Sequence, residues 1–304
     1  MHEKDIAEKI YLSDPERFAD LHNGVYGAGK SLLDPRNLRP IDSDVSGLDE
    51  GKAGIQRRKD INMMYEGKSY GIFGIENQSA VDHTMVVRNL QYGCMTYGRQ
   101  LKEGSFKTLI PCIHTVVYYG QRRWTAPIRL KEMMQTEGLP AELEKVICDY
   151  EITVVDVRRL PDLSVFKTDV RYVFGFIQND RNKQTLKTYV QENETVFRNL
   201  REDAYDMLCV VSHIEELIKL KEKIRTERGG CDMCRGMQEW LEERYEAGVE
   251  AGMDAGKKIG INQGEAKFSQ LVQKLAAENG LDKILHAAEN KDYRMQLYHD
   301  YGLM

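Results

Sequence analysis

The amino-acid sequence predicts an α/β fold in which a mixed sheet is flanked by helices and is followed by a helical C-terminal half. Two observations support this prediction. Up to about residue 160, apolar residues alternate between helical spacing and the period-two spacing of strands. Beyond Pro161 the strand-like runs stop and amphipathic helical segments follow. We therefore expect an α/β core over residues 1–160, a helical region over 161–230 that packs on or beside it, and a charged helical tail over 231–304.

The composition is that of an ordinary soluble protein and excludes several classes of function. The 304 residues include 43 Lys and Arg against 48 Asp and Glu, a net charge of −5, so the molecule as a whole is not a polycation that coats nucleic acid. No apolar run approaches the ~20 residues of a membrane span. The charged N-terminus lacks the apolar segment of a secretory signal. We expect a cytoplasmic protein with no membrane partner.

The first well-defined helix is expected to begin at Ser13. Ser13 and Glu16 have the spacing of a capping box. Phe18 and Leu21 then begin an apolar stripe of helical spacing that would face the core. The sequence NLRPIDSDV at 37–45 is compatible with a short strand that its proline interrupts.

The most informative segment is a predicted β-hairpin around the sequence EGKS. Two strand-like runs flank its glycine, which is a natural turn residue. Because side chains alternate along a strand, Glu76 and Gln78 point to the same face of the sheet. If Glu66 pairs with Tyr70 across a three-residue turn, counting back along the hairpin places Asp60 opposite Glu76.

Two carboxylates in that position repel each other unless a cation neutralises them. Directly opposed side chains have Cβ atoms ~4.5–5.5 Å apart, and oxygen ligands at ~2.0–2.1 Å from Mg²⁺ can come from two acids held at that separation. The hairpin therefore predicts that Asp60 and Glu76 bind a divalent cation. The alternative is that both are solvated acids on an edge hairpin.

A second long helix and two more strands are expected to complete the core. Asp82 can cap a helix whose apolar stripe runs from Val87 to Leu101, and Arg88 lies on a neighbouring stripe that is free to face either the site or solvent. The sequences TLIPCIHTVVYYG and YEITVVDVRRL then read as strands, the first of them covered on both faces. His114, within that strand, is expected to be a core residue and not a ligand.

The cysteines do not form a framework of disulfide bonds or a convincing metal site. Six cysteines are scattered along the chain, and reduced thiols are expected. Cys231 and Cys234 form a single C-x-x-C with no second pair, so an incidental pair of thiols is favoured over a zinc or redox site.

The tail contains a row of glycines at a constant spacing of four, at Gly248, Gly252, Gly256, Gly260 and Gly264. Each helical glycine costs ~1 kcal/mol relative to alanine. A row of small residues also allows the backbones of two helices to approach closely. The two interpretations are a homo-oligomer that forms through the tail and a frayed, charged extension.

The order helix, strand, hairpin with Asp and Glu-x-Gln, helix, strand resembles the PD-(D/E)XK superfamily. In particular it is similar to the bacterial Rpn-type recombination-promoting nucleases, a transposase-like family. The resemblance covers most of the chain through about residue 230. It rests on LSDPERFADLHNG, RRKD at 57–60, IENQSAVDHTMVVRNLQY at 75–92, VVYYGQRRW at 116–124 and FKTDVRYVFGFI at 166–177.

The resemblance implies a restriction-endonuclease-like core and Mg²⁺-dependent hydrolysis of DNA phosphodiesters. The implied catalytic residues are Asp60, Glu76 and Gln78. The implied ligands of Mg²⁺ are Asp60, Glu76, the backbone carbonyl of Asn77, and Asp20 on the first helix, with Glu16 as the other acid there. Gln78 stands where most relatives have lysine, so it can orient groups by hydrogen bonding but cannot supply positive charge. Activation of the attacking water would then depend chiefly on the metal ion.

The resemblance also implies contacts with DNA, although the sequence leaves a second class of function open. Arg57, Arg58, Lys59 and Arg88 are expected to hold the phosphate backbone without reading its sequence. For any single one of them, a solvated surface charge is the alternative. The alternative function is a catalytically inactive nucleic-acid-binding or oligomeric assembly protein that retains the nuclease fold.

Overall fold

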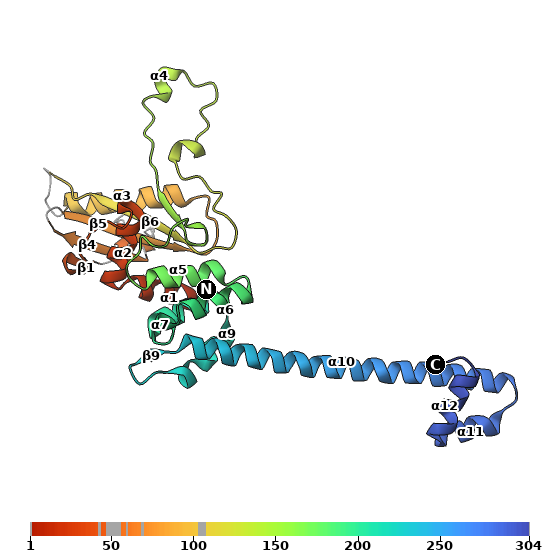
Figure 1. Cartoon of the computed structure of the whole chain (residues 1–304). Helices are drawn as coiled ribbons and strands as arrows, with labels where there is room; N and C mark the ends of the chain where they lie inside the picture. Colours follow the sequence, from red (N-terminus) through yellow and green to blue (C-terminus); the bar gives the residue numbers. More distant parts are fainter. Residues whose placement is uncertain are drawn as a thin grey trace. The chain divides into compact units, whose positions relative to one another are not determined.

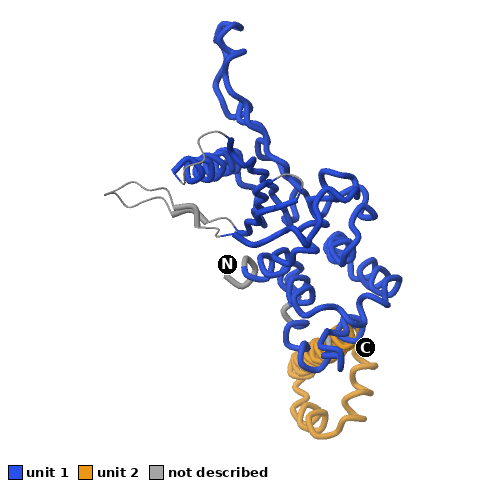
Figure 2. The backbone as a smooth tube through the Cα atoms, turned by 90° about the vertical axis from the view of Figure 1, so that its left-hand side faces the viewer, with its two compact units in different colours: residues 1–237 blue, residues 238–304 orange. Residues whose placement is uncertain are grey.

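The computed structural model of the chain describes residues 2–41, 44–46, 56–58, 60–67, 70–102 and 108–303. The chain forms two compact units, Met1–Met237 and Gln238–Met304 (Figure 2). The first unit contains a mixed sheet, helices on both of its faces and a helical C-terminal part, which confirms the predicted α/β class. Residues 161–230, expected to pack on or beside the core, belong to the same unit as the sheet.

The central sheet has five strands in the order β1-β4-β5-β6-β7 (Figure 1). These strands are β1 (Leu38–Pro40), β4 (Ile61–Glu66), β5 (Tyr70–Gln78), β6 (Cys112–Tyr118) and β7 (Thr153–Asp156). The pairs β1–β4 and β4–β5 are antiparallel, whereas the pairs β5–β6 and β6–β7 are parallel. Two smaller sheets pair β2 (Asp44–Ser46) with β3 (Gln56–Arg58) and β8 (Leu200–Arg201) with β9 (Gly230–Cys231).

The β4–β5 hairpin has the register that the sequence predicts. Glu66 pairs with Tyr70, and the ladder continues without a bulge to the pair of Ile61 with Ile75. Asp60 is the residue directly before this last pair, and Glu76 directly follows it. The hairpin therefore brings the two acids to the same end of neighbouring strands.

Helices cover both faces of the sheet. On one face, Met85 and Val86 of α3 (Met85–Lys102) pack against Val116 of β6. On the other, the ring of His22 in α2 (Pro15–Gly27) meets the ring of Phe73 edge-on. The remaining helices of this unit are α1 (His2–Leu12), α4 (Ala141–Glu144), α5 (Val170–Asn179), α6 (Lys183–Glu192), α7 (Glu194–Phe197), α8 (Glu202–Val211) and α9 (Glu215–Leu220).

The start of α2 differs by one residue from the prediction. Its N-cap is Asp14, whose carboxylate accepts hydrogen bonds from the backbone N–H groups of Glu16 (2.9 Å) and Arg17 (3.2 Å). The hydroxyl of Ser13 donates instead to the carbonyl of Lys9 and so belongs to the end of α1. The capping-box prediction was wrong because the hydroxyl of Ser13 bonds to the last turn of the preceding helix, α1, and is not available to cap α2.

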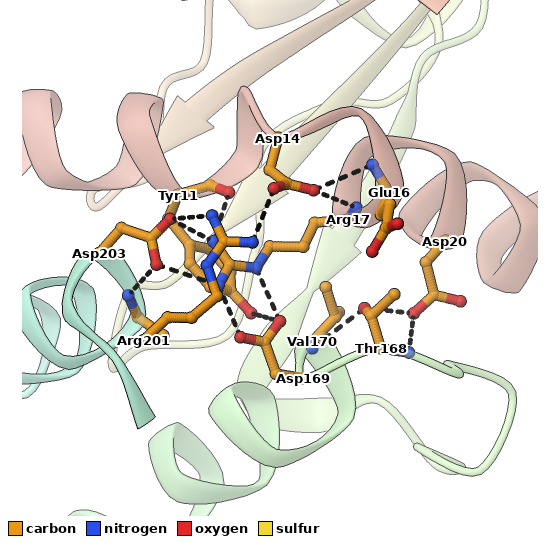
Figure 3. A network of polar contacts seen from close by, with 11 residues as sticks. Tyr11, Asp14, Glu16, Arg17, Asp20, Thr168, Asp169, Val170, Arg201 and Asp203 are labelled. Carbon is orange, nitrogen blue, oxygen red and sulfur yellow. Dashed lines mark hydrogen bonds and ion pairs between the residues drawn. The ribbon is translucent and has the colours of Figure 1, made fainter. Parts of the chain in front are cut away.

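A buried arginine connects four helices of the first unit (Figure 3). The side chain of Arg17 in α2 is 2% exposed. Its guanidinium donates to Asp169, before α5, at 2.6 and 2.7 Å, to Asp203 of α8 at 2.7 and 3.0 Å, and to the carbonyl of Tyr11 in α1. This network joins the helices after residue 161 to those that cover the sheet.

His22 is a buried, neutral histidine whose titration should make stability depend on pH. It is 1% exposed, and its Nδ1 lies 2.8 Å from the carbonyl of Phe18, to which it donates. Burial lowers the pKa of His22 to about 4, despite the opposing effect of that hydrogen bond. At pH values between this pKa and the ordinary value of 6.5, the unfolded chain therefore binds a proton that the folded chain does not.

We expect the free energy of unfolding to fall by about 3 kcal/mol between pH 7 and pH 4 because of His22 alone. The stability that His22 contributes is complete above its unfolded pKa and is lost as the pH falls toward its folded pKa. Urea titrations of the parent and of His22→Gln at both pH values measure this loss, since the glutamine variant lacks it. Parallel pH profiles for the two proteins would contradict the expectation.

The second unit is helical over its described residues. It contains most of α10 (Met233–Ala277), followed by α11 (Leu281–Glu289) and α12 (Lys291–Asp300). The end of α10 packs with the two short helices around a small core of Leu271, Leu275, Ala287, Leu297 and Tyr298. Across the described part of the chain, no helix combines the length and the apolar character that a membrane crossing requires.

Candidate active site

Asp60 and Glu76 meet at the end of the β4–β5 hairpin. The Oδ2 atom of Asp60 accepts a hydrogen bond of 2.8 Å from the backbone N–H of Asn77, the residue after Glu76. Glu76 is only 3% exposed. Both carboxylates influence the hydroxyl of Tyr92 in α3. Burial raises the pKa of Tyr92 most, and the negative charges of Glu76 and Asp60 raise it further. The two acids therefore lie within electrostatic reach of one group.

The positively charged guanidinium of Arg88 in α3 lies beside Glu76. Its guanidinium donates to Oε1 of Glu76 and, at 2.7 Å, to Oδ2 of Asp82. It also donates at 3.5 Å to the hydroxyl of Tyr92. Burial acts to lower the pKa of Arg88, but the charge of Glu76 and the other two contacts outweigh it, so that the pKa is raised. Arg88, a predicted DNA-binding residue, thus faces the site, and its side chain is 28% exposed.

Asp82 fixes both the start of α3 and the position of Arg88. Its Oδ1 accepts from the backbone N–H (2.8 Å) and the hydroxyl (2.7 Å) of Thr84, just before the helix begins at Met85. Partial burial acts to raise the pKa of Asp82, yet the bonds from Thr84 and Arg88 lower it. Asp82 therefore remains ionised and holds the guanidinium beside Glu76.

Gln78 points to the same side as Glu76, as the strand alternation predicts. Its Nε2 lies 3.4 Å from Oε1 of Glu76, to which it donates. The side chain of Asn77 points to the opposite face, where its Oδ1 accepts from the hydroxyl of Tyr119 at 3.4 Å. Asn77 therefore reaches the acids through its backbone and not through its amide.

Asp20, the predicted helix acid, is held by a different part of the chain. It is 5% exposed, and it accepts from the backbone N–H groups of Lys167 and Thr168 at 2.7–2.9 Å and from the hydroxyl of Thr168 at 2.7 Å (Figure 3). These donors fix the segment before α5. Glu16, the other acid considered on this helix, is exposed. A ligand role for Asp20 stays a prediction, and the observed role of its carboxylate is structural.

Glu8 of α1 is a candidate site residue that the sequence reasoning missed. It is 1% exposed, and its charge acts on the same group as that of Asp60: burial, then the charge of Glu8 and that of Asp60, raise the pKa of Tyr119 well above its ordinary value. A signal for Glu8 was present in the sequence. It follows Ala7 and precedes Tyr11 within one helical stripe, and a carboxylate on such a buried stripe requires a partner.

The basic residues before Asp60 are only partly described. Arg57 and Arg58 lie on β3, where their backbones pair with Val45 and Asp44 of β2. Their side chains and the whole of Lys59 lie outside the described residues. Their predicted contacts with DNA therefore stay predictions.

The donor set suits a hard cation held by two carboxylates. Within the described ranges, no group of three or more His, Cys, Asp and Glu side chains could hold a metal ion. Mg²⁺ is usually bound by only one or two carboxylates, and it keeps water and substrate oxygens as its other ligands. Asp60, which accepts from the backbone N–H of Asn77, and Glu76, the residue before Asn77, fit this pattern.

The C-x-x-C pair consists of one buried thiol, Cys231, and one partly buried thiol, Cys234. Burial raises the pKa of Cys231, and it raises that of Cys234 to about 11. Both thiols are therefore protonated at neutral pH, whereas metal binding and redox chemistry require the thiolate. His114 is 8% exposed and lies opposite Gly74 in the β5–β6 ladder, the core position expected for it.

Comparison with known proteins gives a family match for part of the chain. Residues 61–208 match the model of the family described as "Putative transposase, YhgA-like". The matched segment contains Glu76, Gln78 and Arg88, and Asp60 directly precedes it. No curated protein and no solved structure matches the chain.

Proposed function

We propose that this chain, whose residues 61–208 match the model of the YhgA-like putative transposase family, is a metal-dependent DNA endonuclease that hydrolyses phosphodiester bonds. The observation that carries the proposal is the convergence of Asp60 and Glu76 on Tyr92 at one end of the β4–β5 hairpin. A guanidinium, together with a cation that the two carboxylates would hold, suits a reaction in which negative charge develops on a phosphate. DNA is the proposed partner of this site.

Asp60, Glu76 and the backbone carbonyl of Asn77 would hold Mg²⁺. All three supply hard oxygen donors, which is the chemistry that Mg²⁺ prefers. When bound, the ion supplies Lewis-acid stabilisation of the phosphate and makes a water molecule more acidic. We propose that Glu8 of α1 acts with this group, because its charge and that of Asp60 both raise the pKa of Tyr119.

Arg88 supplies the positive charge that is absent from position 78. In this chain Gln78 replaces the lysine that the resemblance leads one to expect, and its amide only donates or accepts hydrogen bonds. Arg88 stays charged at every physiological pH, and its planar guanidinium suits phosphate oxygens. A substrate phosphate would compete with Glu76 for the N–H donors of Arg88, while Asp82 keeps the guanidinium in place.

Neither Gln78 nor Tyr92 is suited to act as a base. The raised pKa of Tyr92 keeps its hydroxyl protonated at neutral pH, so it can donate a hydrogen bond but not accept a proton from water. Gln78, held at 3.4 Å from Glu76, can orient that carboxylate or a water molecule. Proton removal from the attacking water therefore depends on the carboxylates and the bound ion.

A plasmid-nicking assay with Mg²⁺ tests the proposal. The parent should cleave, Asp60→Ala and Glu76→Ala should not, and Glu66→Ala should cleave like the parent because Glu66 lies at the far end of the same hairpin, where it pairs with Arg39. Equal cleavage by the parent and both active-site variants would overturn the enzyme assignment.

The second candidate function is a DNA-binding or assembly protein without catalytic activity, and one observation favours it. The guanidinium of Arg88 already neutralises Glu76 in the protein alone, so the buried acid is stable without a bound cation. DNA binding by the parent with no cleavage at any tested concentration of Mg²⁺ or Mn²⁺ would select this function.

Substitution of Gln78 by lysine should give a folded protein whose cleavage rate is kept or raised. The lysine would place a second positive charge beside Glu76, where Gln78 now contributes only a weak hydrogen bond of 3.4 Å. Rates of plasmid nicking measure the effect. Gln135→Lys, at an exposed position outside the site, is the control for added charge. Complete loss of cleavage with intact Mn²⁺ binding would contradict the role given to Gln78.

A further inference from the structure

The guanidinium of Arg88 occupies the place beside Glu76 that a cation would take. Its Nη2 atom donates to Oε1 of Glu76, a buried carboxylate. The Nε2 atom of Gln78 lies 3.4 Å from the same oxygen. A guanidinium and a divalent cation on one carboxylate would place like charges close together, where little water screens their repulsion. Arg88 and a cation therefore compete for Glu76.

The guanidinium is also attached to an acid that is not a proposed ligand of the cation. Its Nη1 atom donates at 2.7 Å to Oδ2 of Asp82. The other oxygen of Asp82 accepts from the backbone N–H and the hydroxyl of Thr84, at 2.8 and 2.7 Å. Besides its contact with Glu76, Nη2 makes a long contact of 3.5 Å with the hydroxyl of Tyr92. Nη2 can therefore turn from Glu76 to another acceptor while Nη1 stays on Asp82.

A phosphate oxygen is the acceptor that best suits this group. The planar guanidinium presents its N–H donors in a fork that matches phosphate oxygens. The side chain of Arg88 is 28% exposed, so a phosphate at the surface of the site can reach it. In the proposed reaction, the DNA phosphate is bound beside the cation. Binding of the cation to Glu76 and binding of the phosphate to Arg88 therefore require the same contact to break.

Given the proposed nuclease function, on which this step rests, we infer that Arg88 is a switch that couples cation binding to DNA binding. Without DNA, Arg88 neutralises Glu76 and disfavours the cation. With DNA, Arg88 moves to a phosphate and leaves Glu76 to the cation. Such coupling is reciprocal: DNA raises the affinity for the cation by the same factor by which the cation raises the affinity for DNA.

Removal of the charge of Arg88 should strengthen cation binding, whereas removal of a ligand would weaken it. Without DNA, Arg88→Gln should bind Mn²⁺ at least ~10-fold more tightly than the parent, because no positive charge then competes for Glu76. Calorimetric titration of the full chain with Mn²⁺ measures the change. Arg88→Lys keeps the charge but not the planar fork, and its affinity should stay within about threefold of the parental value.

Arg99→Gln is the matched control for the loss of charge. Arg99 is an exposed residue in the last turn of the same helix, α3. It lies about 16 Å along the helix from Arg88, beyond the Debye length of ~8 Å at physiological ionic strength. This variant should bind Mn²⁺ as the parent does. Addition of Glu76→Gln to Arg88→Gln should abolish the gain in affinity, which assigns the gain to Glu76.

Titrations of Mn²⁺ with DNA present test the movement of Arg88 to a phosphate. A short duplex with phosphorothioate linkages, which resist hydrolysis, serves as the DNA. The parent should bind Mn²⁺ at least ~10-fold more tightly with this duplex than without it. In Arg88→Gln the gain should be smaller, because no guanidinium is left to move. Equal gains in the two proteins would overturn the coupling through Arg88.

The results distinguish a failure of the switch from a failure of the proposed function. If the parent cleaves DNA but Arg88→Gln binds Mn²⁺ no more tightly than the parent, the switch is wrong and the nuclease function stands. If Arg88→Gln binds Mn²⁺ more tightly but the parent cleaves no DNA, the switch stands and the nuclease function is wrong. If neither protein binds Mn²⁺, both are wrong.

Crystals of the parent soaked in Mn²⁺ without DNA test the competition even if Arg88→Gln does not fold. An ion bound to Asp60 and Glu76, with the contact between Arg88 and Glu76 broken, is the expected result. An ion bound there with that contact intact would overturn the switch.

Discussion

Substitution of Glu76 by glutamine is expected to lower the rate of DNA cleavage by roughly 10²–10³-fold or more while DNA binding is largely kept. The change preserves the size of the side chain but removes the charge that attracts both a divalent cation and Arg88. Glu76 is 3% exposed, so solvent cannot replace that charge. Cleavage rates, a gel-shift titration of DNA and calorimetric titration of Mn²⁺ without DNA measure the three effects separately.

Glu66→Gln is the matched control for this experiment. Glu66 is an acid on the same hairpin, its side chain is 41% exposed, and it pairs with Arg39 away from the site. This variant should bind Mn²⁺ and cleave DNA as the parent does. Cleavage by Glu76→Gln at the parental rate, or Mn²⁺ binding that Glu76→Gln leaves unchanged, would contradict the role of Glu76.

Substitution of Arg17 by methionine is expected to lower the free energy of unfolding by about 3 kcal/mol. Methionine fills much of the space but leaves Asp169 and Asp203, about a fifth exposed each, without their buried guanidinium. Arg17 also lies over the ring of Tyr11, with the guanidinium carbon 4.1 Å from the ring centroid. Urea titration at neutral pH measures the loss.

Arg36→Met is the control for the Arg17 substitution. Arg36 makes an equally short ion pair with Asp34, at 2.6 Å, but its side chain is 87% exposed, and exposed pairs contribute little to stability. Its loss should leave the free energy of unfolding almost unchanged. Equal effects of the two substitutions would contradict the importance of burial.

The Arg17 network should also weaken in acid. Burial acts to raise the pKa of Asp203, but its bonds to Arg17 lower it. The folded chain therefore holds this carboxylate ionised below the pH at which the unfolded chain protonates it. Its contribution to stability is present above the unfolded pKa and is lost as the pH falls through the lower, folded pKa.

The hairpin and its register could be predicted from the sequence because local rules determine both. The period-two pattern and the glycine in the turn place Glu66 opposite Tyr70, and the rest of the ladder follows by counting. The direction of Glu76 and Gln78 follows from the same alternation. The family match over residues 61–208 confirms the resemblance that these motifs suggested.

Contacts between residues far apart in the sequence could not be predicted in the same way. Nothing local indicates that Arg17 would bond to Asp169 and Asp203, or that the carboxylate of Asp20 would hold the backbone at Thr168. Glu8 was missed because the helix that carries it was not identified. Tertiary packing, and not local pattern, decides which charged residues become buried.

The most direct test of the proposed metal site is the anomalous scattering of Mn²⁺ in crystals of the protein. We expect a strong anomalous peak between the carboxylates of Asp60 and Glu76, with the guanidinium of Arg88 moved away from Glu76. No peak at this position at Mn²⁺ concentrations that support DNA cleavage, or a peak only at some other site, would contradict the account of how this protein acts.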